Sequence, residues 1–158
     1  MPEDNVPSIK EALQKCFETG EYADMTITCS GRTWQVHKVV GCSQVPFFAK
    51  AVTGKFKESR DSCIDLVDDD PSAVGAMLRW LYYGTLEVEE SKPLGMNTAM
   101  FLTRSHKVAD KYLLADLRTT ASQKLKAKLT SDGWDEEDQL ALVGCLSAGA
   151  DERSKAAP

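Results

Sequence analysis

Hydrophobic and polar residues alternate in one short stretch near the start of the chain and follow helical spacing in most other parts. The alternating apolar positions are Met25, Ile27, Cys29, Trp34 and Val36. Because the segment Ser30-Gly31-Arg32 interrupts this period of two, the pattern predicts a β-hairpin with one apolar face. Residues 37–42 are too apolar for a surface loop and too few for an ordinary helix, so we expect a single buried helical turn.

A helix is predicted ahead of this hairpin. Ser8 and Glu11 have the spacing of a capping box, in which each side chain binds a free backbone N–H, and Gly20 supplies a left-handed residue that ends the helix. One face of the helix carries Ile9, Leu13, Cys16 and Phe17. Such a stripe must be buried against another surface. From these residues alone, packing onto the protein's own core is the favoured interpretation.

The residues after the hairpin predict another short helix. Pro46 suits its first position, because a proline there gives up no helical hydrogen bond, and Gly54 ends it. Val45 occupies the cap position, where its side chain cannot accept a free N–H, so the helix start lacks about 1 kcal/mol of stabilisation. The expected buried side consists of Phe47, Phe48, Ala51 and Val52.

Three longer helices are predicted further along. They begin at Pro71 behind an Asp70 cap, at Asn97 or Thr98, and at Asp116. Their core faces are Val74, Met77, Leu78, Leu81 and Tyr82; Met100, Phe101, Val108, Ala109 and Tyr112; and Leu114, Leu117, Ala121, Leu125 and Leu129. We expect His106 and Asp110, four residues apart, to form an exposed ion pair rather than a ligand pair. Residues 134–146 predict a last short amphipathic helix.

Two other stretches have strand character. Residues 63–66 alternate and are bounded by charges, which is typical of an edge strand or a third strand. Residues 84–93 interleave acidic side chains with Leu86 and Val88. A short strand with its apolar side inward is the favoured interpretation of that segment, and a docking surface is the alternative.

Composition adds bounds on size, compartment and partners. The chain has 158 residues, of which 42% are hydrophobic and 27% charged, and it fits one main domain. Its net charge of -5 argues against a nucleic-acid or membrane surface. The acidic N-terminus and the lack of a long apolar run predict an intracellular protein, cytoplasmic, nuclear or both. The five cysteines lack CxxC spacing, which predicts reduced thiols packed as small hydrophobic side chains.

Catalytic chemistry has little support in the sequence. The hairpin brings Asp24 and His37 together, and an enzyme built on them would need a nucleophile at residues 42–43. No strained nucleophile turn presents one. We therefore favour a partly buried charge pair between Asp24 and His37-Lys38 that holds the hairpin to the next helix, and we predict no enzymatic activity.

Metal chemistry has equally little support. A zinc site using Cys29, His37 and Cys42 matches no finger spacing. The carboxylates of residues 68–70 lack the glycine and the further oxygen donors of a calcium loop. We predict neither a metal nor a cofactor.

Several segments occur in an order that points to a known family. They are Tyr22-Ala23-Asp24, Val36-His37-Lys38-Val39-Val40, Cys42 to Phe48, Phe56-Lys57-Glu58-Ser59, Ile64-Asp65-Leu66, Asp69-Asp70-Pro71, Met77 to Gly84, and Ala109-Asp110-Lys111-Tyr112. In this order they resemble the BTB/POZ domain, in the form common among fungal proteins. The resemblance covers residues 8–129 and implies an α+β fold in which a small β-sheet is flanked by a cluster of α-helices.

The resemblance also implies a homodimer. In many BTB proteins a helix before the first strand packs on the partner subunit, and an acidic and a basic residue line the groove at the dimer interface. Carried over residue by residue, the candidate dimer interface is Ile9, Leu13, Phe17, Asp24, His37, Lys38, Val39 and Val40. This expectation replaces packing of the first helix on its own core.

A second implication concerns a ubiquitin ligase. In BTB proteins that recruit a cullin scaffold, a hydrophobic residue two positions before a glutamate fills a cullin pocket, and Phe56 and Glu58 have that spacing. The candidate cullin or partner-binding residues are Phe56, Lys57, Glu58, Tyr83, Leu86 and Val88. The alternative for Phe56 is that it packs into its own core.

Together these patterns give one expected organisation. Residues 1–7 are a flexible N-terminus, 8–129 the BTB/POZ domain, 130–149 a short C-terminal helical extension and 150–158 a flexible tail. The expected function is a homodimeric protein-interaction module that recruits substrates, as yet unknown, to a cullin-type ubiquitin ligase. The alternative is a dimerisation module of a transcriptional or scaffolding protein without a role in ubiquitin ligation.

Overall fold

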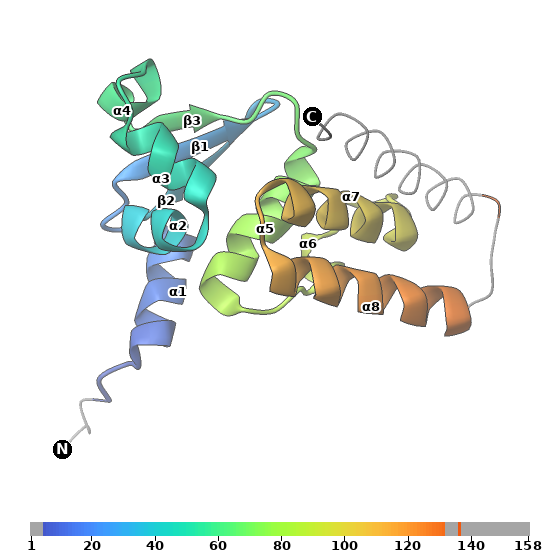
Figure 1. The fold of residues 1–158 in the computed structure, drawn as a ribbon. Helices are drawn as coiled ribbons and strands as arrows, with labels where there is room; N and C mark the ends of the chain where they lie inside the picture. Colours follow the sequence, from blue (N-terminus) through green and yellow to red (C-terminus); the bar gives the residue numbers. More distant parts are fainter. Residues whose placement is uncertain (1–4, 132–135, 137–158) are drawn as a thin grey trace. The chain divides into compact units, whose positions relative to one another are not determined.

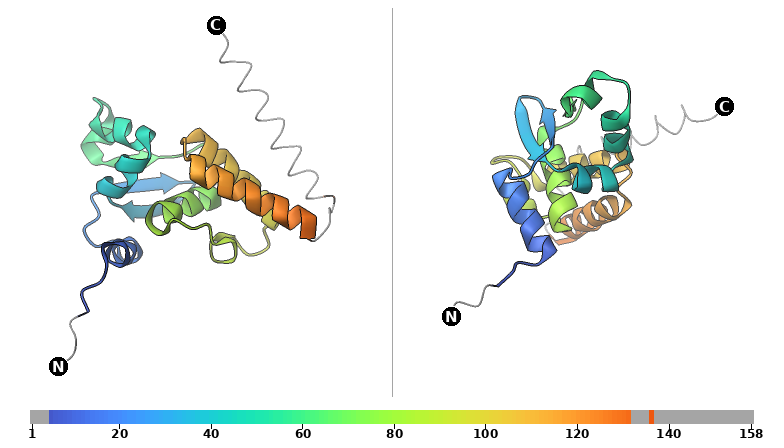
Figure 2. Two further views of the ribbon diagram at one scale, coloured as in Figure 1. Left: turned by 60° about the horizontal axis from the view of Figure 1, so that its bottom comes forward. Right: turned by 90° about the vertical axis from the view of Figure 1, so that its left-hand side faces the viewer.

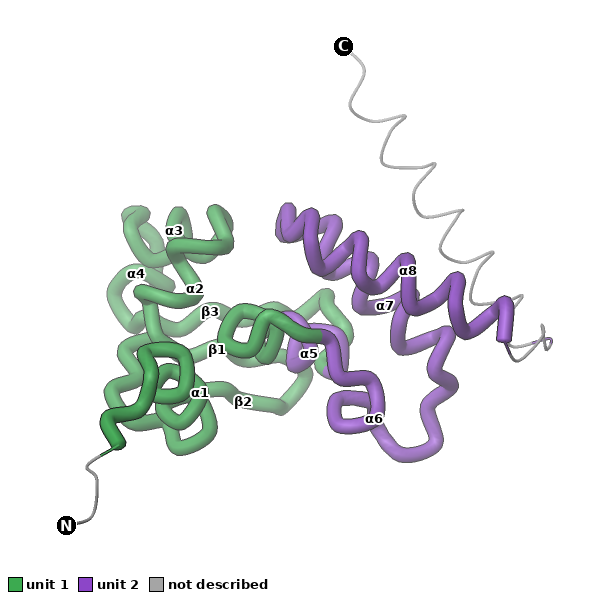
Figure 3. Tube along the Cα trace, turned by 90° about the horizontal axis from the view of Figure 1, so that it is seen from below, with its two compact units in different colours: residues 1–71, 78–85 green, residues 72–77, 86–158 purple. Residues whose placement is uncertain are grey.

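The computed structural model describes residues 5–131 and 136, which form helices and one small sheet (Figure 1). The elements are α1 (Ile9–Thr19), β1 (Met25–Cys29), β2 (Arg32–Val36), α2 (Lys38–Gln44), α3 (Pro46–Thr53), α4 (Lys57–Asp61), β3 (Cys63–Asp65), α5 (Pro71–Tyr83), α6 (Val88–Ser91), α7 (Thr98–Lys111) and α8 (Ala115–Ser131). The chain divides into unit 1, residues 1–71 and 78–85, and unit 2, residues 72–77 and 86–158 (Figure 3). Helix α5 contributes residues to both units.

The sheet of unit 1 confirms the predicted hairpin and the predicted third strand. Its order is β2-β1-β3, with β1 antiparallel to β2 and parallel to β3. The buried face comes from the alternating positions of β1, which are Met25, Ile27 and Cys29. At the hairpin turn, Ser30 and Gly31 both have positive φ, at 48° and 81°. That combination matches the right-handed twist of paired strands and explains the glycine.

Helix α1 begins and ends where the sequence predicts. The Ser8 hydroxyl accepts a hydrogen bond from the Glu11 N–H, and the Glu11 carboxylate accepts one from the Ser8 N–H. Gly20 ends the helix with φ at 76°. The Ser8 backbone N–H and the Ser8 hydroxyl both donate to the Glu11 carboxylate, and these two bonds lower the pKa of the Glu11 carboxyl because they favour its ionised form.

The structure has helix α2 where the sequence predicts a single buried turn. It runs for seven residues, and although Val40 and Gly41 are buried, Val39 is 72% exposed. The helix lies close to β1 because Gly41 has no side chain, and a Cβ there would sit 3.0 Å from the Met25 methyl carbon. This close approach turns one face of α2 toward the sheet and leaves Val39 facing outward.

At the start of helix α3, the residue in the cap position is used for core packing. Val45 stands at the cap position without a side-chain bond, as predicted, and its side chain is fully buried. Burial of a valine contributes about 1.5–3 kcal/mol, which exceeds the roughly 1 kcal/mol that a capping side chain would add. The predicted buried side of α3 is only partly right, since Phe48 is buried and Phe47 is half exposed.

Unit 2 corrects the strand predicted within residues 84–93. The segment instead forms the helical turn α6, in which the Lys92 N–H bonds to the Val88 carbonyl. Glu89 and Glu90 lie in its first turn, where negative charge interacts favourably with the helix dipole. Alternating acidic and apolar residues therefore follow one helical turn here rather than a strand.

Helices α7 and α8 pack side by side and confirm the two long helical predictions (Figure 1). The Asn97 side chain caps α7 by accepting the Met100 N–H. The core residues of the pair include Phe101, Leu102, Val108, Leu117, Ala121, Leu125 and Leu129.

The predicted ion pair on α7 is wrong. Asp110 instead pairs with Arg118 on α8, at 2.8 Å. His106 is partly buried, and the loss of hydration lowers the pKa of its imidazole below the ordinary 6.5. The Asp110 charge opposes this shift, and the Arg118 charge adds to it.

Apart from residue 136, the helix predicted over residues 134–146 lies outside the described residues, and so does Cys145. Within residues 5–131 and 136, none of the helices has the length and apolar character needed to cross a bilayer.

The lowered His106 pKa predicts a pH dependence of unfolding. Because the folded state binds this proton more weakly than the unfolded chain, stability is present above pH 6.5 and is lost as pH falls from there through the folded pKa. We expect His106→Gln to lose less unfolding free energy than wild type between about pH 7.5 and about pH 5.5. Urea titrations at both pH values measure this. Equal losses in the two proteins would contradict the prediction.

Candidate functional site

A hydrogen-bonded cluster around Tyr82 organises the surface of unit 1 that carries most of the predicted site residues. The backbone N–H of His37 donates to the Tyr82 hydroxyl at 2.9 Å, and the same hydroxyl lies 2.8 Å from His37 Nδ1. His37 Nε2 lies 2.6 Å from the Glu21 carbonyl oxygen. Since a carbonyl can only accept, Nε2 carries the proton and Nδ1 accepts from the Tyr82 O–H. In this tautomer each of the three groups has a hydrogen-bond partner.

This cluster corrects the expected charge pair between Asp24 and His37-Lys38. The Asp24 carboxylate accepts a hydrogen bond from the backbone N–H of Lys38 at 2.7 Å, at the first residue of α2. It therefore acts as a cap from outside the helix, where His37 provides no side-chain cap. The pair does hold the hairpin to α2, but through a carboxylate-to-backbone bond.

The electrostatics of the cluster are those of a structural site. Burial raises the pKa of Tyr82 to about 12, an effect only partly offset by the bond from His37. Burial likewise raises the pKa of the Cys42 thiol, which keeps it in the protonated, less nucleophilic form. Both His37 ring nitrogens are already engaged. Cys42 is accordingly not the activated nucleophile that the enzyme hypothesis requires.

Metal ligation is the second chemical alternative to a structural role. Among the described residues, no three His, Cys, Asp or Glu side chains are placed to hold one ion. Cys29 instead donates its thiol hydrogen to the Asp69 carbonyl oxygen, with 3.2 Å between sulfur and oxygen.

Helix α1 is attached to unit 1 by its last turns. The Phe17 ring stacks on the Tyr82 ring with 4.3 Å between centroids. One residue further on, the Tyr83 hydroxyl donates to the Glu18 carboxylate. The right-hand view of Figure 2 shows α1 beside α5, to which both tyrosines belong. This attachment fixes the direction of α1.

The first turns of α1 have no such contacts. None of the residues of α1, all of which the structure describes, is buried, and Ile9 is 80% exposed. Leu13 is half-buried one turn further on. The apolar stripe predicted from the sequence is therefore present, and the described residues leave its N-terminal half uncovered.

Two exposed apolar side chains stand next to Asp24 and Lys38 in the sequence. Val39 directly follows Lys38, and Tyr22, two residues before Asp24, is 85% exposed and has a positive φ of 60°. A positive φ is unusual for a bulky residue and is a feature of strained or functional sites. Tyr22 was absent from the predicted site residues, because hydrophobic patterning does not indicate on which side of a turn a side chain lies.

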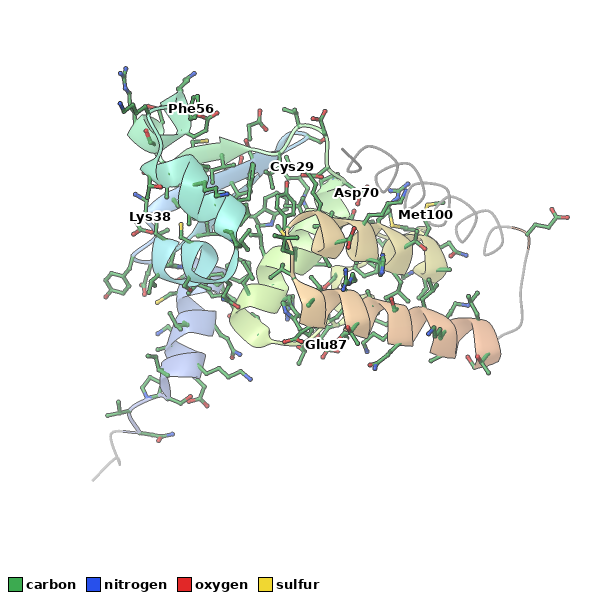
Figure 4. The ribbon with its side chains drawn as sticks, viewed as in Figure 1. Cys29, Lys38, Phe56, Asp70, Glu87 and Met100 are labelled. Atoms are coloured by element: carbon green, nitrogen blue, oxygen red, sulfur yellow. The ribbon has the colours of Figure 1, made fainter. Side chains whose placement is uncertain are left out.

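The second predicted site lies at α4. Phe56 stands directly before this helix and is 73% exposed, so the alternative that it packs into the core is wrong (Figure 4). Lys57 and Glu58 are exposed as well. Three of the six predicted partner-binding residues thus form one exposed segment.

The other three predicted partner-binding residues are less available. Leu86 is 2% exposed, so its side chain offers no surface to a partner. Tyr83 is occupied by its bond to Glu18 and by the Arg79 guanidinium, which lies 4.4 Å from the ring centroid. Val88 is half-buried on α6.

Comparison with known proteins identifies the fold that carries these sites. The family model of the BTB/POZ domain matches residues 13–129. The chain belongs to the BTB/POZ family. The BTB domain of zebrafish PATZ1 superposes with a TM-score of 0.57 at 13% identity, covering 75% of this chain and 88% of that one. The predicted α+β BTB fold is thereby confirmed, and the fungal subtype stays a prediction.

Two relatives show how such BTB domains occur in longer chains. An Arabidopsis thaliana BTB/POZ domain-containing protein is 33% identical over 122 residues, covering 76% of this chain and 15% of its own length. The human Kelch repeat and BTB domain-containing protein 4 is 28% identical over 113 residues, covering 72% of this chain and 20% of its own length. The present chain thus corresponds to a small part of each, and it is a protein-interaction module of the BTB type.

The Tyr82 cluster predicts a specific loss of stability. Tyr82→Phe leaves the His37 N–H and Nδ1 without their partner in a buried position, which costs about 1–3 kcal/mol of unfolding free energy. Urea denaturation measures this. Tyr83→Phe is the matched control, because it removes an exposed bond and should cost less than about 1 kcal/mol. Equal effects of the two substitutions would contradict the role assigned to Tyr82.

Proposed function

We propose that this BTB domain homodimerises and acts as a substrate-recruiting adaptor for a cullin-type ubiquitin ligase. The observation that carries the dimer is the uncovered apolar half of α1. The observation that supports the adaptor role is the exposed segment from Phe56 to Glu58.

The proposed dimer is supported by the contacts that α1 lacks among the described residues. A helix of 11 residues is marginal in water without tertiary packing. Phe17 and Glu18 hold its last turns, but Ile9 lies beyond any such contact. A second copy of the domain, offering the same surface, would cover Ile9 and Leu13 and complete the packing of α1.

The proposed dimer surface separates into contacting and supporting residues. Ile9, Leu13, Lys38 and Val39 have exposed or half-exposed side chains and would touch the partner. Asp24 caps α2, whereas His37, Val40 and Phe17 lie beneath the surface or against Tyr82. In this proposal the second group acts by holding α1 and α2 in position.

The adaptor role rests on the family implication for residues 56–58. An exposed aromatic side chain is a typical anchor in a protein interface, and a nearby carboxylate adds polar specificity. Phe56 and Glu58 provide both within one turn. Leu86 is left out of the proposed partner surface because it is buried.

The dimer predicts that a charge on α1 disrupts association. Ile9→Asp would place a carboxylate in an apolar interface and weaken the dimer by about 2 kcal/mol or more, roughly thirtyfold. Sedimentation equilibrium at micromolar concentration measures this. Val67→Asp, at another exposed apolar residue of unit 1, is the control and should remain dimeric. A monomeric wild-type protein, or an unaffected Ile9→Asp dimer, would rule out the proposed interface.

The adaptor role predicts direct binding to a purified cullin N-terminal domain. Phe56→Ala should weaken that binding by about 2 kcal/mol, because the aromatic anchor is lost. Calorimetric titration measures the affinity, with Leu113→Ala as the control at an exposed residue of unit 2. Failure of a folded, dimeric wild-type protein to bind would refute the adaptor role and favour the alternative dimerisation module.

A further inference from the structure

Phe56 is exposed, yet its ring is not surrounded by solvent on every side. Gly54, two residues earlier, lies directly under it. A Cβ built on Gly54 would stand 3.2 Å from Phe56 Cδ2 and 3.7 Å from Phe56 Cε2. The ring edge therefore rests on the backbone of residue 54, in space that any other residue would occupy with its side chain.

The backbone of Gly54 does not itself demand glycine. Its φ and ψ are -74° and -179°, which is extended backbone open to every residue type. Its N–H ends α3 by donating to the Lys50 carbonyl at 3.0 Å, a bond that any non-proline residue can make. A side chain at this position would instead crowd the Phe56 ring and the Lys50 carbonyl oxygen, which is 3.2 Å from the same Cβ position.

The backbone carbonyl of Phe56 is also held by hydrogen bonds. Its carbonyl oxygen accepts the Ser59 hydroxyl at 2.7 Å and the Ser59 backbone N–H at 3.1 Å. The backbone of Phe56 is thus tied to the first turn of α4, while its ring rests on Gly54. The carbonyl bonds and the ring contact together favour one orientation of the Phe56 side chain.

We propose that Gly54 is a positioning residue for partner binding: it provides a seat that holds the Phe56 ring in its docking orientation before a partner arrives. The proposal rests on the proposed adaptor function for its biological meaning. Ordering a mobile side chain on binding weakens affinity by about two- to tenfold, and a preformed seat avoids that loss. A larger residue at position 54 fills the space that the Phe56 ring occupies, and it leaves the Phe56 side chain itself unchanged.

The test uses Gly54→Val, whose branched side chain suits extended backbone and fills the seat. We expect its affinity for the purified cullin N-terminal domain to fall about two- to tenfold, with a dimer of unchanged size. Gly54→Ala should give a smaller loss, and Thr53→Val, on the neighbouring exposed residue, should give none. In a Phe56→Ala background, Gly54→Val should have no further effect. A loss that persists in that background, or no loss at all, would overturn the proposal.

A second measurement separates this proposal from the adaptor function. In the free wild-type protein, the ring current of Phe56 should shift the Gly54 α-protons away from their random-coil positions in the NMR spectrum. Phe56→Ala should return them toward those positions, and Lys55→Ala should leave them shifted. If the cullin domain does not bind, the adaptor role is refuted. The NMR measurement still shows whether the Phe56 ring lies against Gly54. Identical Gly54 shifts in wild type and Phe56→Ala would show that no seat exists.

Discussion

The hydroxyl of Tyr82 is the group on which the arrangement of unit 1 depends. It accepts the N–H of His37 and donates to the ring of the same residue, and its aromatic ring stacks on Phe17. The end of the hairpin, the start of α2 and the last turns of α1 are thereby tied to α5. Because the hydroxyl is buried, losing one of these bonds leaves a polar group without a partner, which is costly.

This constraint determines which apolar groups remain exposed. With α1 fixed by Phe17 and Glu18, its first turns extend beyond the cluster, and Ile9 is uncovered. With α2 capped by Asp24 and set against Met25 through Gly41, Val39 faces outward. The polar contacts of His37 and Asp24 therefore create the surface proposed for a second copy of the domain.

The sequence predicted the elements better than the exposure of individual side chains. The hairpin, the capping box and the helices α5, α7 and α8 follow from periodicity and capping chemistry, which are local. Whether Val39 or Phe47 is buried depends on how closely α2 approaches the sheet, which a pattern does not contain. Asp24 was paired with the wrong group because charge alone does not distinguish a side chain from a helix N-terminus. Whether Phe56, an aromatic residue among charges, is buried or exposed depends on the path of the chain between α3 and α4, which the pattern does not contain either.

The central claim is that the Tyr82 cluster fixes α1 so that its apolar half packs on a second copy. Isotope-filtered NOE spectroscopy on a dimer of labelled and unlabelled chains tests it directly, using the methyl groups of Ile9, Leu13 and Val39. The account predicts NOEs between the two copies at these methyl groups, alongside NOEs within one copy between Phe17 and Tyr82. Methyl groups of α1 that contact only their own chain, in a sample shown to be dimeric, would contradict it.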